Sequence, residues 1–513
     1  MPFPLSETPP PTVSGSWTAG RVCLSLAALL AIIRAAIHVR AFWISDAGVD
    51  HTAGVIIAMA VDLTHGVFYR PLFGPEGYGG TRYFPLYFVL HAVLLKLHVP
   101  VLLGAYLLSL VAVLFLIVGV FYLLVRIGAE RWLAAACAGT LLASVPAQWA
   151  VISPHADALA CALNVWGLVV IVGSTRSTRR TLLAAMLFAL AWSAKLTTCF
   201  GLAAAVLWLA NVGLRRRALQ LAAGTAIGYS LVAAVMVVFS HGRVVEIFRA
   251  CALGGMGWKQ FISGLPSMCW IAFHTDLNIF LLVLFALTAL MEELLEFPAK
   301  CLKHLSVLFF IATTIATVVI FGSPGTTWNH LLDIQVAAVV LLGWLAAQPS
   351  QVRRQVGIYA LAIATLIPAG VGAAAVLLKQ PADPALTSNG SRLHRVVGLV
   401  GKSDSPVLAE NPIIPVLAGR TPYVLDPWML LLLRKRSPDF GEPLLQRVHN
   451  RAFGAVVLSM DPETDYGRDW YGTQHFGPGF AAALKENYRL LSVTDGQFVY
   501  VPINGPAPPV DGR

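Results

Sequence analysis

Residues 101–125 read VLLGAYLLSLVAVLFLIVGVFYLLV and contain no charged side chain. A helix needs about 20 consecutive apolar residues to cross the hydrocarbon core of a bilayer, so this stretch predicts a membrane-spanning helix. Similar apolar runs centre on residues 22–43, 132–152, 157–173, 181–195, 199–213, 218–239, 274–291, 304–322, 330–347 and 355–378. Together these runs predict an α-helical polytopic membrane protein with about eleven transmembrane helices.

The composition of the 513-residue chain supports this assignment. Hydrophobic residues make up 57% and charged residues 12% of the sequence, and its mean hydropathy is +0.72. A soluble domain has about 25% charged residues, so a soluble, nucleic-acid-binding or disordered protein is excluded. The first run is long, begins at Arg21 after a neutral Pro/Ser-rich leader and lacks a small-residue cleavage site, which argues against a signal peptide. The seven cysteines form no CxxC pair and are interpreted as buried hydrophobic residues.

Basic residues cluster between the apolar runs and predict the orientation of the chain. The clusters are Arg126/Arg131, Arg176/Arg179/Arg180, Arg215/Arg216/Arg217, Lys300/Lys303 and Arg353/Arg354. If the spans after residue 100 alternate, every cluster falls on one side, which the positive-inside rule assigns to the cytoplasm. Residues 44–100, 240–273 and everything after residue 379 then lie outside, and the N-terminus is cytoplasmic. The Ala/Arg-rich composition and the lack of a targeting signal indicate a bacterial inner membrane.

The apolar stretch 83–97, YFPLYFVLHAVLLKL, decides on which side the N-terminus lies. As a helix it is only about 22 Å long at ~1.5 Å per residue, and it contains Pro85, His91 and Lys96. We therefore expect an interfacial helix rather than a span. If the stretch crossed the membrane instead, the N-terminus would be external and residues 44–80 would be internal.

Polar residues at the external helix ends are the candidates for function, because charge near a membrane is scarce and costly. The candidates for substrate binding come from many separate spans and loops: Asp157, Lys195, Arg82, Tyr83, Arg243, Arg249, Lys259, Asn329, His330 and Asp333. Acids and bases that meet on one membrane face indicate a site for a polar, anionic substrate presented at the lipid surface. The alternative for each residue is that its side chain extends into the lipid headgroups.

Two carboxylates follow the first span and are the candidates for a general base. Asp50 precedes an apolar segment, residues 53–63, that we expect to lie as an amphipathic helix along the membrane. A carboxylate at the mouth of a membrane cavity can take a proton from an attacking hydroxyl. The alternative role for Asp50 is that of an N-cap, for which Asp is favoured. Asp46 is the second candidate.

Four short motifs carry a resemblance to a known superfold. They are the acidic first external loop ending in FPLY, the segment SPHADALA (residues 153–160), the segment SAKLTT (193–198) and the segment WNHLLD (328–333). Over residues 22–378 this layout resembles the GT-C superfold of polyprenyl-phosphate-sugar glycosyltransferases, which includes protein O-mannosyltransferases and the lipid A aminoarabinose transferase. SPHADALA is similar to the second external acidic position of that group, which places Asp157 there. Many relatives pair the loop acid with an adjacent Glu, whereas here Ala47 and His51 follow the two candidates.

The resemblance implies an enzyme that transfers a sugar from a polyprenyl-phosphate donor to a glycan, lipid or protein acceptor of the cell envelope, on the external face of the bilayer. Asp50 would deprotonate the acceptor hydroxyl, and nearby Lys and Arg side chains would stabilise the leaving phosphate. Asp157 could also hold a divalent cation with His51 or His330, since carboxylates and imidazoles suit such ions. No HxxxH or DxD spacing occurs in these loops, so the metal stays an open alternative.

Beyond Gln380 the composition becomes that of a soluble protein. Strand-like runs at residues 405–410, 422–426, 454–460 and 490–502 alternate with helix-like runs at 428–436, 443–451 and 479–487. This alternation predicts a small extracytoplasmic α/β domain over residues 380–513, following a transmembrane module over residues 1–379. We expect it to cover the cavity or to select the acceptor.

The main alternative function is that of a polytopic transporter or a flippase for lipid-linked sugars. Transporters place ionisable groups near the bilayer midplane on broken helices in repeated halves. Neither a repeat nor such a pair is evident here, apart from Lys195 between two short runs. A third alternative, a catalytically silent scaffold for envelope assembly, would not require so many external carboxylates.

Overall fold

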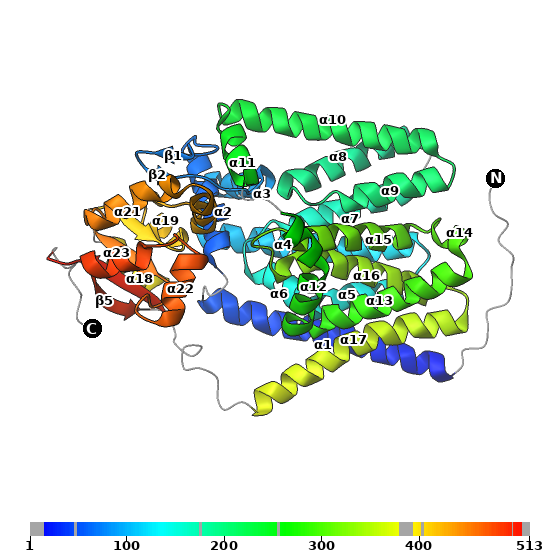
Figure 1. The fold of residues 1–513 in the computed structure, drawn as a ribbon. Helices are drawn as coiled ribbons and strands as arrows, with labels where there is room; N and C mark the ends of the chain where they lie inside the picture. Colours follow the sequence, from blue (N-terminus) through cyan, green and yellow to red (C-terminus); the bar gives the residue numbers. More distant parts are fainter. Residues whose placement is uncertain are drawn as a thin grey trace.

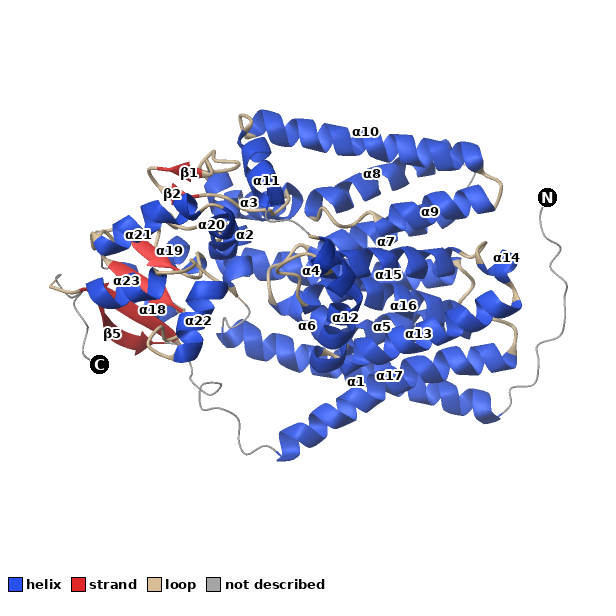
Figure 2. Cartoon of the chain, viewed as in Figure 1, coloured by secondary structure: helices blue, strands red, loops and turns tan. Residues whose placement is uncertain are grey.

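The computed structural model describes residues 15–45, 49–173, 177–253, 257–378, 393–401, 405–494 and 496–504 of the chain. These residues form a long helical bundle with a small mixed sheet domain at one end (Figure 1). Figure 2 shows that the strands are confined to that end, while the rest of the chain is helical. The predicted combination of a polytopic helical module and a C-terminal α/β domain is confirmed. The predicted boundary at residues 379 and 380 lies outside the described residues.

The bundle consists of helices that run between the sheet domain and the opposite end of the molecule. Its helices are α1 (Gly15–Ser45), α4 (Val101–Arg126), α5 (Arg131–Thr140), η1 (Leu141–Ala143), α6 (Val145–Ile152), α7 (Asp157–Gly173), α8 (Thr178–Ala194), α9 (Phe200–Asn211), α10 (Arg215–Phe239), α13 (Leu277–Glu296), α14 (Pro298–Cys301), α15 (Leu305–Phe321), η2 (Trp328–His330), α16 (Leu331–Ala346) and α17 (Gln351–Leu378). Helix α7 packs against α4 and α8, and α16 packs against α15 and α17.

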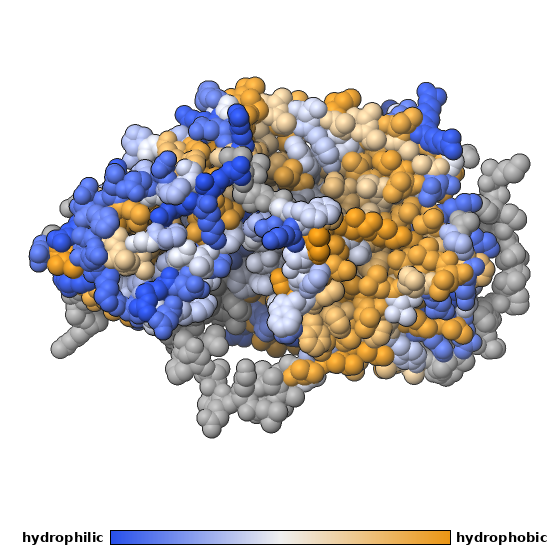
Figure 3. All heavy atoms as spheres, in the orientation of Figure 1, coloured by the Kyte–Doolittle hydropathy of each residue, from blue (hydrophilic) through white to orange (hydrophobic). Residues whose placement is uncertain are grey.

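Six described helices are long and apolar enough to cross a membrane. They cover Ala19–Arg40, Val101–Arg126, Arg215–Phe239, Leu277–Glu296, Trp328–Ala346 and Gln351–Val371. Figure 3 shows hydrophobic side chains over the visible face of the bundle, with hydrophilic side chains over the sheet domain and at the far end. These features are those of a multi-pass membrane protein. Helices α7, α9 and α15 are shorter apolar helices of the same bundle, so the number of about eleven spans stays a prediction.

One expected span is broken. Residues 132–152 do not form a straight helix, because α5 and η1 meet α6 at an angle of 79°. The break occurs at Ser144, whose hydroxyl accepts the N–H of Ala147 at 3.2 Å, and Pro146 lies in the first turn of α6. Asp276 accepts the freed N–H of Val145 at 2.6 Å. Helix α6 therefore ends directly before the segment that contains His155 and Asp157.

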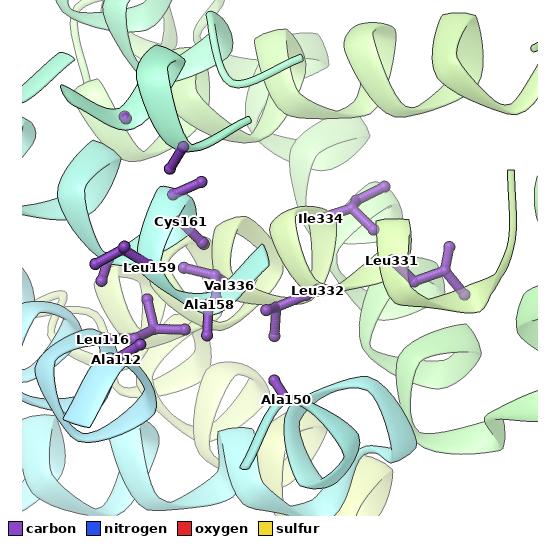
Figure 4. Packing of buried hydrophobic residues seen from close by; sticks show 14 of the residues in the cluster. Ala112, Leu116, Ala150, Ala158, Leu159, Cys161, Leu331, Leu332, Ile334 and Val336 are labelled. Atoms are coloured by element: carbon purple, nitrogen blue, oxygen red, sulfur yellow. The ribbon is translucent and has the colours of Figure 1, made fainter. Parts of the chain in front are cut away.

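The core of the bundle is densely packed around α7 and α16. Small residues such as Ala158 and Cys161 on α7 are fully buried and face Leu332 and Val336 of α16 (Figure 4). Small side chains allow two helices to approach closely inside a membrane. The close contact fixes the first turns of α7 and α16 beside one another, and these turns carry Asp157 and Asp333.

The segment after α1 forms α2 (His51–Thr64), a short hairpin of β1 (Phe73–Gly74) and β2 (Gly77–Tyr78), and α3 (Pro85–Lys96). Helix α3 has 12 residues, the short helix expected for residues 83–97. Helix α2 was expected to lie along the membrane with one apolar face, but all of residues 53–60 are buried. The reason is that α2 packs against α3 on one side and against the C-terminal domain on another.

The C-terminal domain contains β3 (Val407–Ala409), β4 (Ala455–Leu458), β5 (Tyr488–Thr494) and β6 (Gln497–Pro502) in the order β3-β4-β6-β5. Strand β3 runs parallel to β4, with Leu408 opposite Val456, and the other pairs are antiparallel. The run at 490–502 is a hairpin rather than one strand, and residues 422–426 form only an isolated bridge from Val424 to Tyr78. Its helices are α18 (His394–Gly401), α19 (Ile413–Leu417), α20 (Pro427–Arg436), η4 (Pro438–Gly441), α21 (Glu442–His449), α22 (Asp465–Thr473) and α23 (Phe480–Asn487).

The C-terminal domain is fixed to the first loop by backbone pairing. The Tyr78 N–H donates to the Tyr423 carbonyl at 2.8 Å, and the Leu425 N–H donates to the Tyr78 carbonyl at 2.9 Å. Gly77 permits this approach, since it has a φ of +113° and an added Cβ would lie 1.9 Å from the Tyr423 oxygen. The Asn411 amide also donates to the Val49 carbonyl at 2.8 Å. The first loop, and Asp50 with it, is therefore held between the bundle and the C-terminal domain.

Candidate functional site

A cluster of charged side chains lies where the bundle meets the first loop. It combines Asp50 at the start of α2, the segment between α6 and α7, Lys195 at the end of α8, and the turn η2 before α16. Six predicted site residues meet here: Asp50, Asp157, Lys195, Asn329, His330 and Asp333. We call this set, together with His155, the Asp157 cluster.

Asp50 is the most accessible carboxylate of the Asp157 cluster. Its Oδ1 accepts the N–H of Ala53 at 2.8 Å, so it is the N-cap of α2, the structural role that the sequence allows. The same oxygen lies 3.3 Å from Nε2 of His155. The Asp50 side chain is 33% exposed, whereas those of His155 and Asp157 are 8% and 11% exposed. Capping therefore leaves one face of the carboxylate open to a ligand.

Asp157 lies at the centre of the cluster, and both of its carboxylate oxygens contact neighbouring side chains. One carboxylate oxygen accepts a hydrogen bond from the Lys195 ammonium, and Asn329 Nδ2 lies 3.2 Å and 3.3 Å from the two oxygens. Nδ1 of His155 lies 3.6 Å from Oδ2. Lys195 reaches Asp157 because it ends α8 in an extended conformation, stabilised by Thr198, whose hydroxyl donates to the Lys195 carbonyl at 2.8 Å. This carboxylate is held by its neighbours rather than offered to a substrate.

His155 interacts electrostatically with both carboxylates, Asp50 and Asp157. Burial opposes its protonation, but Asp50 and Asp157 on either side outweigh this and raise the pKa of His155 to about 10. Burial likewise opposes ionisation of Asp50, and the neighbouring His155 imidazolium holds the pKa of Asp50 below its ordinary value. At neutral pH the pair is therefore an imidazolium beside an ionised, partly exposed carboxylate.

Two members of the Asp157 cluster present buried polar atoms without a partner among the described residues. They are Nδ1 of His330 and Oδ1 of Asp333. Thr327 orients the η2 turn by donating to Asn329 Oδ1 at 2.7 Å, and Asn329 in turn contacts Asp157. Buried polar atoms are costly when unpaired, so these two atoms indicate where a ligand or ordered water completes the site.

The other predicted residues lie around this cluster. Arg82 is exposed and its Nη1 donates to the Pro324 carbonyl at 3.4 Å. Burial raises the pKa of the nearby Asp426 carboxyl, and the Arg82 guanidinium opposes only part of that rise. The Tyr83 carbonyl accepts the Tyr69 hydroxyl at 2.8 Å. Arg243, on α11 (Arg243–Leu253), donates to the Tyr69 carbonyl at 3.2 Å and so supports the first loop.

Two predicted bases are not brought to the cluster, and one predicted acid cannot be placed. Arg249 of α11 is exposed, and Lys259 is exposed on α12 (Trp258–Thr275). No hydrogen bond or ion pair joins either side chain to the Asp157 cluster within the described ranges. Asp46 lies outside the described residues.

A second polar centre in the C-terminal domain faces the start of α2. Glu410 is 2% exposed and accepts hydrogen bonds from His475 Nδ1 at 2.6 Å, Trp470 Nε1 at 2.8 Å and the Tyr471 hydroxyl at 2.8 Å. Burial opposes its ionisation, but these donors lower the pKa of Glu410 to about 2. The His475 ring lies edge-on to His51, with the ring centroids 4.6 Å apart. The C-terminal domain thus brings an oriented imidazole beside the residue that follows Asp50.

The described site residues do not form a metal cage. Across the described ranges no group of three or more His, Cys, Asp and Glu side chains is arranged to hold a metal ion. Asp50 and Asp157 face opposite nitrogens of one imidazole, and His51 faces His475 instead of Asp157. The alternative in which Asp157 and His51 share a cation is therefore not supported by the position of His51.

Three site residues were not predicted from the sequence. His155 stands two positions before Asp157 in SPHADALA, and that spacing was its only local signal. Glu410 and His475 are 65 residues apart and meet only through the folding of the C-terminal domain. No spacing rule connects them.

Comparisons with known proteins concern the fold. No protein-family profile and no curated protein sequence matches the chain. An oligosaccharyltransferase of Archaeoglobus fulgidus in complex with Zn and sulfate aligns with a TM-score of 0.55 at 12% identity, over 91% of this chain and 71% of that chain. AglB from Archaeoglobus fulgidus, in complex with an inhibitory peptide and a dolichol-phosphate, aligns with a TM-score of 0.55 at 12% identity, over 95% and 74%.

A bacterial structure gives the same result. ArnT from Cupriavidus metallidurans bound to undecaprenyl phosphate aligns with a TM-score of 0.50 at 12% identity, over 96% of this chain and 100% of that chain. These likenesses span the bundle and the C-terminal domain together. The predicted resemblance to the GT-C fold is confirmed, and at this level of identity it is a likeness of fold.

Proposed function

We propose that the chain is a membrane glycosyltransferase that moves a sugar from a polyprenyl-phosphate donor to an acceptor hydroxyl at the external face of the membrane. The observation that carries the proposal is Asp50, an ionised and one-third exposed carboxylate held by His155 at the mouth of a GT-C bundle. Dolichol-phosphate and undecaprenyl phosphate are bound by two proteins of similar fold, which supports a lipid-phosphate donor.

In this mechanism Asp50 is the general base. It takes the proton of the acceptor hydroxyl while the hydroxyl oxygen attacks the anomeric carbon of the sugar. The bond between that carbon and the phosphate oxygen breaks, and the electron pair leaves with the polyprenyl phosphate. His155 is a positioning residue, since its imidazolium keeps Asp50 ionised and oriented before the acceptor arrives.

The developing charge on the phosphate requires donors on the other side of the sugar. Arg82 and His330 suit this role, because Arg82 is exposed beside the cluster and the Nδ1 of His330 has no partner among the described residues. Lys195 and Asn329 are committed to Asp157 and act as positioning residues. The Glu410–His475 pair faces His51 from the C-terminal domain and suits contact with the acceptor.

Sugar transfer by the purified protein in lipid nanodiscs tests the proposal. The donors are tritium-labelled hexose and pentose esters of undecaprenyl phosphate, and the acceptor is a cell-envelope extract. Asp50→Asn should lower the transfer rate by about 10²–10⁴-fold, the usual contribution of a general base. Asn is as good an N-cap as Asp, so α2 should remain intact. Asp439→Asn, an exposed carboxylate of the C-terminal domain, is the matched control and should transfer normally.

Normal transfer by Asp50→Asn would eliminate Asp50 as the base. Movement of the labelled lipid across the bilayer without any transfer would favour the alternative of a flippase. A loss of transfer in both Asp50→Asn and Asp439→Asn would also contradict the assignment, because it would show no dependence on the position of the lost charge.

A further inference from the structure

The end of the bundle opposite the Asp157 cluster contains a cavity of about 190 Å³. It lies between the ends of α4, α7, α9, α15 and α16, and its walls include Arg126, Lys303 and His304 together with Trp208 and Trp344. Helix α7 begins at Asp157 and ends at Gly173, which separates this cavity from the Asp157 cluster by about 25 Å at ~1.5 Å per residue. We call it the basic pocket.

Arg126, which lines the basic pocket, meets a second guanidinium, that of Arg180, at the end of α7. A Cβ built on Gly173 would lie 2.9 Å from Nη1 of Arg180 and 3.0 Å from Nη1 of Arg126, so both groups surround the end of α7. Neither arginine forms an ion pair with a described carboxylate. By contrast, Arg353 at the same end pairs with Glu293 at 2.9 Å and Glu296 at 3.1 Å. Two adjacent cations that repel one another are held together here without a counter-charge from the described residues.

The N-terminus of α15 opens into the same cavity. The first N–H groups of a helix have no intrahelical acceptor, and the N-cap His304 makes no side-chain hydrogen bond to them. The hydroxyl of Ser306 lines the pocket, is buried at 2% exposure and has no partner among the described residues. The helix terminus, the hydroxyl and the cations all favour an anion with several acceptor oxygens, which is the chemistry of a phosphate group.

The surroundings of the basic pocket favour a lipid as the source of that phosphate. Trp344 packs against His304 with ring centroids 4.6 Å apart, and Trp208 also lines the pocket. Tryptophan side chains at a helix end are typical of the membrane interface, and basic pockets between transmembrane helices bind phospholipid headgroups. We propose that the basic pocket binds the phosphate of an anionic phospholipid, and that this site is separate from the site of sugar transfer.

Lipid retention measured by native mass spectrometry tests this proposal on the full chain. Purified protein is titrated with phosphatidylglycerol or phosphatidylcholine of matched acyl chains, and inorganic phosphate is added as a competitor. The double variant Arg126→Gln/Arg180→Gln should bind phosphatidylglycerol about 30-fold more weakly, roughly fivefold per arginine. Arg179→Gln/Arg216→Gln removes the same charge at the same end and is the matched control, which should bind like the wild type.

A second variant guards against a folding defect. Ser306→Ala removes a hydroxyl that no described residue uses, so the fold should be unaffected while the affinity for phosphatidylglycerol falls by about tenfold, the loss of a hydrogen bond to a charged group. Equal binding of both lipids, or equal weakening by the two double variants, would overturn the proposal. Displacement of the lipid by millimolar phosphate would overturn its lipid part and assign the pocket to free phosphate.

Discussion

The two ends of α7 differ in how their charges are balanced. At the N-terminal end of α7, Asp157 contacts Lys195, Asn329 and His155, so its negative charge is balanced by cations of the protein itself. We call this the balanced end. At the C-terminal end of α7, Arg126 and Arg180 surround Gly173, and no carboxylate among the described residues pairs with either of them. Balanced charges hold Asp157 and Asp50 in place without a ligand, as a site that must position a reacting carboxylate requires. Among the described residues of that cluster, only the unpaired buried atoms of His330 and Asp333 are left for a ligand or water to complete. An unbalanced cluster is completed by what it binds.

The largest effect on stability is expected when Lys195 is removed from the balanced end. Lys195→Met should lower the free energy of unfolding by about 3–5 kcal/mol, because it removes the ammonium that pairs with the buried Asp157 and leaves only the more distant His155 imidazolium beside it. Lys303→Met makes the same change at the basic pocket, where Lys303 is exposed, and should stay within about 0.5 kcal/mol. Both variants are compared by SDS unfolding monitored by tryptophan fluorescence.

The double variant Asp157→Leu/Lys195→Met sharpens this comparison. Removal of both buried charges should recover part of the stability that Lys195→Met loses, since no buried carboxylate remains that has lost its ammonium partner. If Lys195→Met and Lys303→Met had equal effects, the two ends would not differ in charge balance.

The second expected effect concerns pH at the balanced end. The folded pKa of His155 is raised from its ordinary 6.5 to about 10, so its contribution to stability is full below pH 6.5 and is lost as the pH rises through 10. His155→Gln should cost about 1.5–3 kcal/mol at pH 6, the value of a hydrogen bond to a charged group. The difference between wild type and variant should shrink at pH 10. A difference that stays constant from pH 6 to pH 10 would show that His155 is not protonated in the folded protein.

The helical module could be predicted from the sequence because its signal is local. A run such as residues 101–125 has one stable arrangement in a bilayer, that of a helix. The bend at Ser144 was missed because residues 132–152 remain apolar on both sides of it, and the N–H freed at the break is satisfied by Asp276, 131 positions away. The hydropathy of a segment cannot predict a hydrogen-bond partner that is so distant in the sequence. The burial of α2 was missed for the same reason, since its cover comes from the distant C-terminal domain.

The candidate site was predictable where its residues stand at helix ends. Asp50, Asp157, Lys195 and the WNHLLD motif each mark the start or end of a helix, and the predicted topology assigned all of them to the same side of the membrane. His155 was missed because its role depends on two carboxylates that lie on opposite sides of its ring. Arg249 and Lys259 were predicted on the same side of the membrane as the Asp157 cluster but do not lie in it. The distribution of basic residues predicts on which side of the membrane a residue lies, and it does not predict where on that side the residue lies.

The third prediction compares the effect of one added methyl group near the Asp157 cluster with its effect near the basic pocket. Gly54→Ala in α2 would place a Cβ 2.1 Å from Asn411 Oδ1 and 3.0 Å from the backbone nitrogen of Ile413, which belong to the docked C-terminal domain. Overpacking costs about 1–3 kcal/mol, and the gain in helix propensity offsets up to about 1 kcal/mol of that. Gly173→Ala meets only the flexible ends of Arg126 and Arg180 and should be nearly neutral. Limited proteolysis of the C-terminal domain and SDS unfolding measure both changes, and a tolerated Gly54→Ala would show that the domain can move away from α2.

The smallest expected effect lies at the basic pocket and depends on the lipid. Without anionic lipid, Arg126→Gln should change the stability by less than about 0.5 kcal/mol, because the guanidinium has no described carboxylate to lose and its repulsion with Arg180 is relieved. With phosphatidylglycerol present, the wild type should be stabilised more than the variant, since a ligand that binds the folded state raises its melting temperature. Thermal unfolding in detergent with and without this lipid gives both values. A loss above about 1 kcal/mol without lipid would mean that the protein itself balances Arg126, and the contrast between the two ends of α7 would then disappear.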